Sequence, residues 1–336
     1  MRDSRGFAQA LLGDGTPAIK LTAVMLVFSG AFALYLSAVH QFLPHDIAWL
    51  GMSAAEVCAL HGCRVAAFMF HDRASFGGAL VAIGVLWLWI AEFPLRQKQA
   101  WAWWALAASG TLGFLSFLAY LGYGYLDSWH GVGTSVLLAC WVVGMARVFP
   151  TLEGPRGPAT LLRPGQPAAR RSRYGAGRAL MLATAAGMLA GGGSILVLGM
   201  TTVFVPQDLH FMHVSRDALA AISPRLIPLI AHDRAGFGGA LVSCAVAVAA
   251  CAWCGAPGRA LWQALAAAGV FGFGCATGVH FAVGYVDATH LAPAVTGSVL
   301  FAAAIATLRR PMLADAPAAD AAPVGADAAF AATSRG

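Results

Sequence analysis

Long apolar runs separated by short polar stretches dominate the hydrophobic pattern of the chain. Each run has about 20 residues, the length that an α-helix needs to cross the hydrocarbon core of a bilayer. Such runs lie at residues 19–40, 74–93, 103–124, 132–149, 179–203, 236–254, 261–284 and 292–308. The pattern predicts an all-α integral membrane protein with eight transmembrane helices.

Three ionisable residues, His-Asp-Arg, begin an eleven-residue motif that occurs twice. Residues 71–81 and 232–242 differ at one position, and residues 124–130 share four of seven positions with residues 284–290. Each copy contains an even number of apolar runs, so both copies would have the same orientation in the membrane. The chain is therefore predicted to consist of two tandem parallel four-helix repeats.

The repeats and the local composition divide the chain into four predicted segments. These are a first four-helix repeat at 1–149, a cytoplasmic linker rich in Pro, Gly and Arg at 150–178, a second four-helix repeat at 179–310 and a disordered cytoplasmic tail at 311–336. In each repeat the loop after the first apolar run is long. Ser53 with Glu56, and Ser215 in the second loop, predict short surface helices there.

The composition supports a membrane protein and bears on its orientation. The 336 residues are 59% hydrophobic and 11% charged, against about 25% charged in an average soluble domain. Basic residues concentrate in alternate loops, which places both termini in the cytoplasm. Apolar helices indicate a bacterial-type inner membrane, with the lipid bilayer as partner. No basic stripe is interleaved with stacking aromatic residues, so no nucleic-acid partner is expected, and the oligomeric state stays open.

The polar residues shared by the two copies predict a site at the periplasmic end of each repeat, because ionisable residues at membrane depth are costly and usually functional. Residues three apart in a helix lie about 60° apart, so Asp127 can face the same site as His130, and Asp287 the same site as His290. His and Asp are ligands for zinc, iron or manganese. The candidate metal ligands are His71, Asp127, His130, His232, Asp287 and His290.

The two His-Asp-Arg triplets supply the candidate catalytic residues. Consecutive helical residues lie about 100° apart, so three of them cannot aim at one point. One or two of each triplet are expected to face the Asp–His pair, while the arginine holds a substrate anion or neutralises the adjacent aspartate. The candidates are His71, Asp72, Arg73, His232, Asp233 and Arg234.

Structural explanations compete with these assignments. Asp127 and Asp287 could be helix N-caps, Asp46 and Asp208 could cap the surface helices, and the Asp–Arg neighbours could form a structural salt bridge. The glycine pairs that follow each triplet predict close helix packing below the polar residues.

Several residues have no counterpart in the other copy. Cys58 and Cys63 could form a local disulfide, or bind a metal together with His61. The closely spaced Cys251 and Cys254 are interpreted as packing residues. His280 lies within the seventh apolar run without a clear partner.

The duplicated His/Asp set favours a metal-dependent membrane enzyme, a hydrolase or an oxidoreductase, that uses a divalent transition metal on a lipid-soluble or periplasmic small molecule. One alternative is a transporter or proton-coupled permease in which the same groups relay protons. Another is a non-catalytic membrane scaffold. Whether the two copies form two sites or one shared site is left open by the sequence.

Overall fold

The computed structural model describes residues 6, 13–125 and 128–314, and within them the chain forms helices and a single isolated β-bridge, between Gln99 and Glu153. The long helices are α2 (Thr16–Ala38), α5 (Arg64–Ile90) with its π-helical extension η1 (Ala91–Leu95), α6 (Ala100–Ser116) with the short α7 (Ala119–Tyr123), α8 (Ser128–Val148), α9 (Arg173–Met200), α12 (Leu226–Cys254), α13 (Arg259–Val283) and α14 (Ala288–Leu313). The predicted all-α class is confirmed. Eight of the described spans are long and apolar enough to cross a bilayer, which suggests a multi-pass membrane protein.

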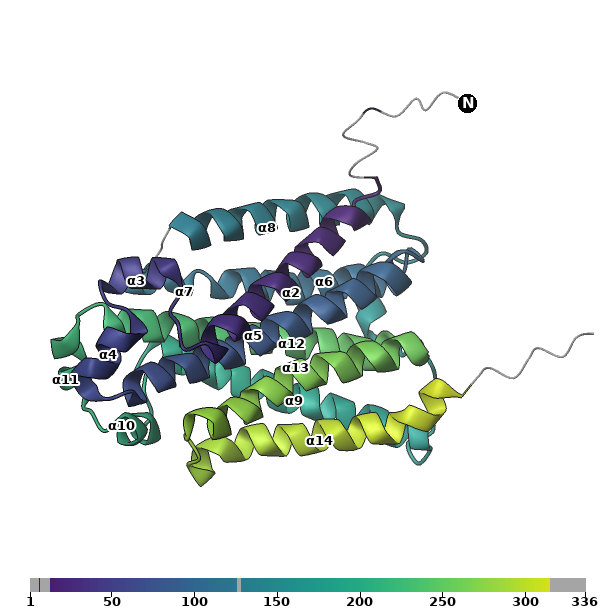
Figure 1. Cartoon of the computed structure of the whole chain (residues 1–336). Helices are drawn as coiled ribbons and strands as arrows, with labels where there is room; N and C mark the ends of the chain where they lie inside the picture. The colour runs from purple at the N-terminus through teal and green to yellow at the C-terminus, as the bar shows by residue number, and fades with distance from the viewer. Residues whose placement is uncertain (1–5, 7–12, 126–127, 315–336) are drawn as a thin grey trace, which may run out of the picture.

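Helices α5 and α12, which carry the two His-Asp-Arg triplets, form the centre of the bundle. In their most apolar stretches 78% and 67% of the residues are buried, against 17% to 33% in the other six spans. Helices α2 and α13 pack on α5, whereas α6 and α9 pack on α12, and the two central helices also contact each other (Figure 1). Helices buried on all sides explain why both triplets are followed by uninterrupted apolar sequence.

The glycine pairs after the triplets allow the central helices to approach their neighbours closely, as the sequence predicted. A Cβ atom added at Gly78 would lie 2.6 Å from the carbonyl oxygen of Phe271 on α13. A Cβ atom at Gly239 would lie 2.0 Å from Cβ of Ser116 at the end of α6. Any larger residue at either position would push a neighbouring helix away from the core.

Four short helices gather at one end of the bundle: α3 (Pro44–Leu50), α4 (Ala54–His61), α10 (Pro206–Met212) and α11 (Arg216–Ile222) (Figure 1). The predicted starts of α4 and α11 are confirmed, because the Ser53 hydroxyl accepts a hydrogen bond from the Glu56 amide and Ser215 caps Ala218 in the same way. Cys58 and Cys63, on either side of the end of α4, are joined by a disulfide. The end of the bundle at which α3, α4, α10 and α11 lie is called the short-helix end below.

The opposite end, here the linker end, holds the start of α2 and the end of α14 (Figure 1). The segment predicted as a linker contains the 3-10 helices η2 (Phe149–Thr151) and η3 (Pro158–Leu162), and α9 begins inside it at Arg173. Helix α14 continues to Leu313, past the predicted start of the tail, and residues 315–336 lie outside the described part of the chain. The tandem repeat stays a prediction.

Candidate metal centre

Three histidine side chains from three different helices meet at the short-helix end of the bundle. His71 lies on α5, His280 near the end of α13 and His290 in the first turn of α14. One potential ligand atom from each of the three residues lies within 4.8 Å of the other two. His71 and His280 are buried, and His290 is partly buried. Within the described residues, this group could hold a metal ion.

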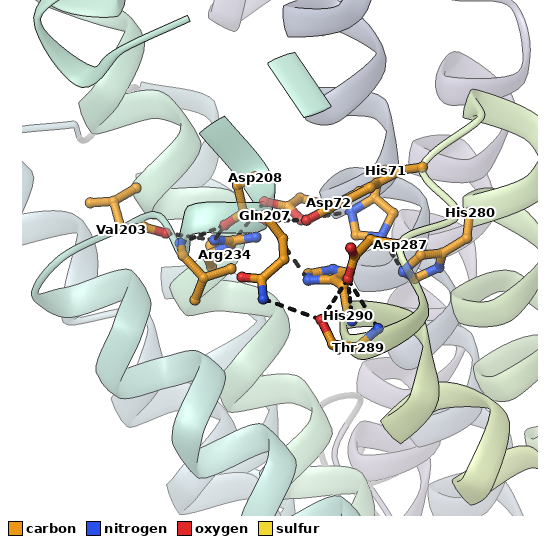
Figure 2. Close-up of polar contacts among 12 residues, drawn as sticks. His71, Asp72, Val203, Gln207, Asp208, Arg234, His280, Asp287, Thr289 and His290 are labelled. Carbon is orange, nitrogen blue, oxygen red and sulfur yellow. Dashed lines mark hydrogen bonds and ion pairs between the residues drawn. The ribbon is translucent and has the colours of Figure 1, made fainter. Parts of the chain in front are cut away.

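The His71 and His280 rings face each other through their Nε2 atoms, which lie 3.0 Å apart (Figure 2). Nδ1 of His71 lies 3.0 Å from Oδ1 of Asp72, and Nδ1 of His280 lies 2.7 Å from the carbonyl oxygen of Ala276. Both of these oxygens accept hydrogen bonds, so the hydrogen-bond network assigns the proton of each ring to Nδ1. Each Nε2 atom then presents a lone pair to the other.

Two facing lone pairs favour a positive species between or beside them, either a shared proton or a metal ion. A tetrahedral metal with metal–nitrogen bonds of about 2.0–2.1 Å holds neighbouring imidazole nitrogens about 3.3 Å apart. The observed 3.0 Å is within a few tenths of an ångström of that value. Metal-bound histidines usually donate their second N–H to a carboxylate or a backbone carbonyl, and Asp72 and Ala276 supply one of each.

The aspartates and arginines of the two triplets form crossed ion pairs between α5 and α12. Nη2 of Arg73 lies 2.9 Å from Oδ2 of Asp233, and Nε of Arg234 lies 3.3 Å from Oδ2 of Asp72. All four side chains are buried. The three residues of a triplet therefore do not converge on one point, as the helical geometry predicted. The histidine and the aspartate contact each other, whereas the arginine reaches the aspartate of the other central helix.

Two aspartates from the short helices complete the ionic cluster. Asp46 accepts a hydrogen bond from the Tyr125 hydroxyl at 2.5 Å and forms an ion pair with Arg73 at 2.6 Å. Asp208 contacts Tyr285 at 2.7 Å and Arg234 at 2.5 Å. Each of these aspartates also accepts a hydrogen bond from the backbone amide just before its own short helix, that of Leu43 for Asp46 and that of Val205 for Asp208. Both aspartates thus cap α3 and α10, two short helices that precede the predicted ones, and the same carboxylates neutralise the buried arginines.

The cluster has an excess of negative formal charge. Four buried carboxylates, from Asp46, Asp72, Asp208 and Asp233, face two buried guanidinium groups, from Arg73 and Arg234. With the adjacent histidines neutral, the excess is two charges among the described side chains. A buried uncompensated charge is costly, so the cluster favours a cation, and one divalent metal ion held by neutral histidines would balance it.

Tyr285 and Asp208 fix the position of His290. The Tyr285 ring stacks on the His290 ring, with centroids 4.4 Å apart, and Nδ1 of His290 lies 3.8 Å from Oδ1 of Asp208. Burial, reinforced by the adjacent Asp208 carboxylate, raises the pKa of Tyr285, which therefore remains a hydrogen-bond donor at neutral pH. His290 is held on one face by the tyrosine and at one edge by the aspartate.

Asp287 acts as the N-cap of α14. Its Oδ1 atom accepts hydrogen bonds from the Thr289 hydroxyl and from the backbone amides of Thr289 and His290 (Figure 2). These hydrogen bonds lower the pKa of Asp287, which is exposed. The structural alternative considered for this residue is therefore observed. Asp287 supports the triad by fixing the backbone of His290 and is not a member of it.

The remaining predicted ligands are placed as follows. His232 forms the equivalent contact to its own neighbour, with Nδ1 3.0 Å from Oδ1 of Asp233, and its ring meets the Tyr125 ring edge-on at 4.7 Å between centroids. Asp127 and the side chain of His130 lie outside the described residues. The structure brings His71 together with His290, from the other copy of the predicted repeat.

His280 is the member of the candidate triad that the sequence did not predict. It stands four residues before Gly284, and the matching position before Gly124 is Tyr120. The candidate site residues were those shared by both copies of the predicted repeat, and His280 has no histidine counterpart in the first copy. Its place in an otherwise apolar run was the signal that could have found it, because an ionisable residue inside a membrane span is a candidate functional residue in its own right.

Comparison with protein-family models, curated proteins and solved structures found no match to this chain.

Proposed function

We propose that the protein is a metal-dependent membrane enzyme whose divalent transition metal is bound by His71, His280 and His290. The observation that carries the proposal is the 3.0 Å separation of two Nε2 atoms whose Nδ1 atoms are both engaged by acceptor oxygens. The nearby third imidazole and the excess negative charge of the cluster support it.

The donor set indicates the class of chemistry. Three protein ligands leave a fourth position for water or substrate, which is typical of catalytic rather than structural metal sites. Imidazole nitrogen suits zinc, iron, copper or nickel better than manganese. A metal in such a site polarises a carbonyl group, lowers the pKa of bound water or changes its oxidation state. The activity would thus be that of a hydrolase or an oxidoreductase on a lipid-soluble or periplasmic small molecule.

The neighbouring residues support the metal ligands in this proposal. Asp72 orients the His71 ring, while Asp208 and Tyr285 orient the His290 ring. Arg73 and Arg234 neutralise the buried carboxylates, which favours that role over the binding of a substrate anion. We place the protein in a bacterial-type inner membrane, with both termini in the cytoplasm and the metal centre near the periplasmic surface, on the basis of the basic residues in the sequence.

A proton-coupled permease is the second candidate. Two imidazoles whose Nε2 atoms lie 3.0 Å apart can also share a proton. Contacts then continue from His71 through Asp72 and Arg234 to Asp208. Uptake into proteoliposomes driven by a pH gradient, without bound metal, would favour this function. The third ring near the pair favours the metal.

Elemental analysis of the purified protein tests the proposal. The wild type is expected to retain about one transition-metal ion per chain, and the His71→Ala and His280→Ala variants are expected to lose it. His210 is an exposed histidine on the short helix α10 and is absent from the triad, so His210→Ala is the matched control. Absence of metal from a folded wild type, or equal metal in all four proteins, would refute the metal centre.

A further inference from the structure

The linker between α8 and α9 is fixed to the bundle at the end opposite the metal centre. The Gly165 amide donates a hydrogen bond to the Trp253 carbonyl oxygen at 2.9 Å, and the Trp104 indole donates to the Arg156 carbonyl oxygen at 2.8 Å. Leu161 packs against the hydrophobic core. These contacts join the linker to α6 and α12, so its exposed side chains have defined positions.

The linker carries six arginines and one glutamate between residues 150 and 178. Three of the arginines are engaged by the protein itself. Arg156, Arg173 and Arg178 donate hydrogen bonds to backbone carbonyl oxygens of Leu152, Thr307 and Gln166, respectively. The side chains of Arg163, Arg170 and Arg171 are exposed and make no hydrogen bond or ion pair with any residue that the structure describes.

An exposed leucine directly precedes one of these arginines, Arg163. Leu162, the last residue of η3, is 77% exposed, although its neighbour Leu161 is packed into the core. The linker joins the ends of two candidate membrane spans, Gly131–Thr151 and Arg173–Met200, so it lies at the level where a bilayer surface would meet the bundle. An apolar side chain beside basic ones at that level is typical of a segment that lies in the membrane interface.

We propose that this surface, formed by Leu162, Arg163, Arg170 and Arg171 and here called the linker surface, binds the headgroups of anionic phospholipids. Leu162 inserts among the acyl chains, and the three guanidinium groups contact lipid phosphates. Guanidinium groups form paired hydrogen bonds with phosphate oxygens. Each basic residue near an anionic membrane surface strengthens binding about fivefold. The linker surface is independent of the proposed metal centre, which lies at the other end of the bundle.

Native mass spectrometry of the full-length protein in detergent micelles with added phosphatidylglycerol or phosphatidylcholine tests this proposal. We expect phosphatidylglycerol to be retained at least about tenfold more tightly than phosphatidylcholine. The Arg163→Gln/Arg170→Gln/Arg171→Gln variant is expected to lose this preference. The matched control is the Arg163→Lys/Arg170→Lys/Arg171→Lys variant, which keeps the charge and is expected to keep most of the preference.

Two outcomes would overturn the proposal. One is equal retention of phosphatidylglycerol by the wild type and the glutamine variant. The other is displacement of the lipid by millimolar inorganic phosphate, which would identify a site for free phosphate instead of a lipid surface. The substituted residues are exposed, so circular dichroism and elution volume should show folded variants. Metal content is measured on the same samples, so failure of the metal centre and failure of the linker surface are told apart.

Discussion

His71 and His280, which are 209 residues apart in the sequence, place their Nε2 atoms 3.0 Å from each other in the interior of the bundle. Their rings are nearly perpendicular, with centroids 4.3 Å apart. Each ring is fixed on its other side by an oxygen that accepts the Nδ1 proton. The pair is thus prepared for a cation before any cation binds, which reduces the reorganisation that binding requires.

Replacing Asp72 by Asn should weaken metal binding by about tenfold to a hundredfold, because a neutral amide supports the His71 ring less well than a carboxylate. A competition titration with a chromophoric chelator measures the effect. Asp233→Asn is the matched control, since Asp233 contacts His232 and the opposite arginine in the equivalent way but does not touch the triad. Equal loss of affinity in both variants would mean that the effect comes from general destabilisation.

Removal of the metal should lower the unfolding temperature of the wild type. A ligand present at about a thousand times its dissociation constant stabilises the folded state by about 4 kcal/mol. Thermal unfolding in detergent, with and without a chelator, should show a clear shift for the wild type and none for His280→Ala. A chelator effect of the same size in the His280→Ala variant would assign the stabilising metal to another place.

Breaking one crossed ion pair should destabilise the bundle strongly. Arg73→Gln leaves Asp46 and Asp233 buried without their cation, and loss of one partner of a buried pair costs about 3–5 kcal/mol. The double variant Arg73→Gln/Asp233→Asn should lose less than the sum of the two single variants, because the unpaired charge is removed as well. Chemical unfolding of the four proteins measures the coupling, and strictly additive losses would contradict the observed pairing.

Asp287 gives a pH-dependent prediction. Its pKa is lowered in the folded protein by the Thr289 hydroxyl and the His290 amide. Its stabilising effect is therefore complete above the unfolded value of about 3.9 and is lost as the pH falls through the lower folded value. Asp287→Ala should lower the unfolding temperature at pH 7, and the difference from the wild type should disappear in strong acid. Asp287→Asn, which keeps the N-cap, should resemble the wild type at pH 7.

The sequence predicted the helical architecture well because membrane-length apolar runs are a strong local signal. The caps at Ser53 and Ser215 were predicted for the same reason: a capping residue acts within one turn of its own helix. Some boundaries differ. Helix α5 begins at Arg64, ten residues before the apolar run predicted at 74–93, because ion pairs and hydrogen bonds satisfy the ionisable triplet inside the bundle.

Which residues form the candidate metal centre depends on contacts between helices that are far apart in the sequence. A single sequence does not show which of these helices lie in contact. His71 was expected to meet Asp127 and His130, and its nearest observed imidazole is that of His280 on α13. Pairing within one copy was the simplest expectation. The close contact of α13 with α5, made possible by Gly78, brings His280 and His290 to His71, and the expected contact with Asp127 and His130 falls outside the described residues.

X-ray absorption spectroscopy of the metal-loaded protein tests the metal centre most directly. The bound metal should show a first shell of nitrogen or oxygen at about 2.0–2.1 Å, with the outer-shell scattering of three imidazole rings in the wild type and of two in a His290→Ala variant. A sulfur shell, a shell of oxygen alone or an unchanged spectrum after replacement of His290 would contradict a metal held by His71, His280 and His290.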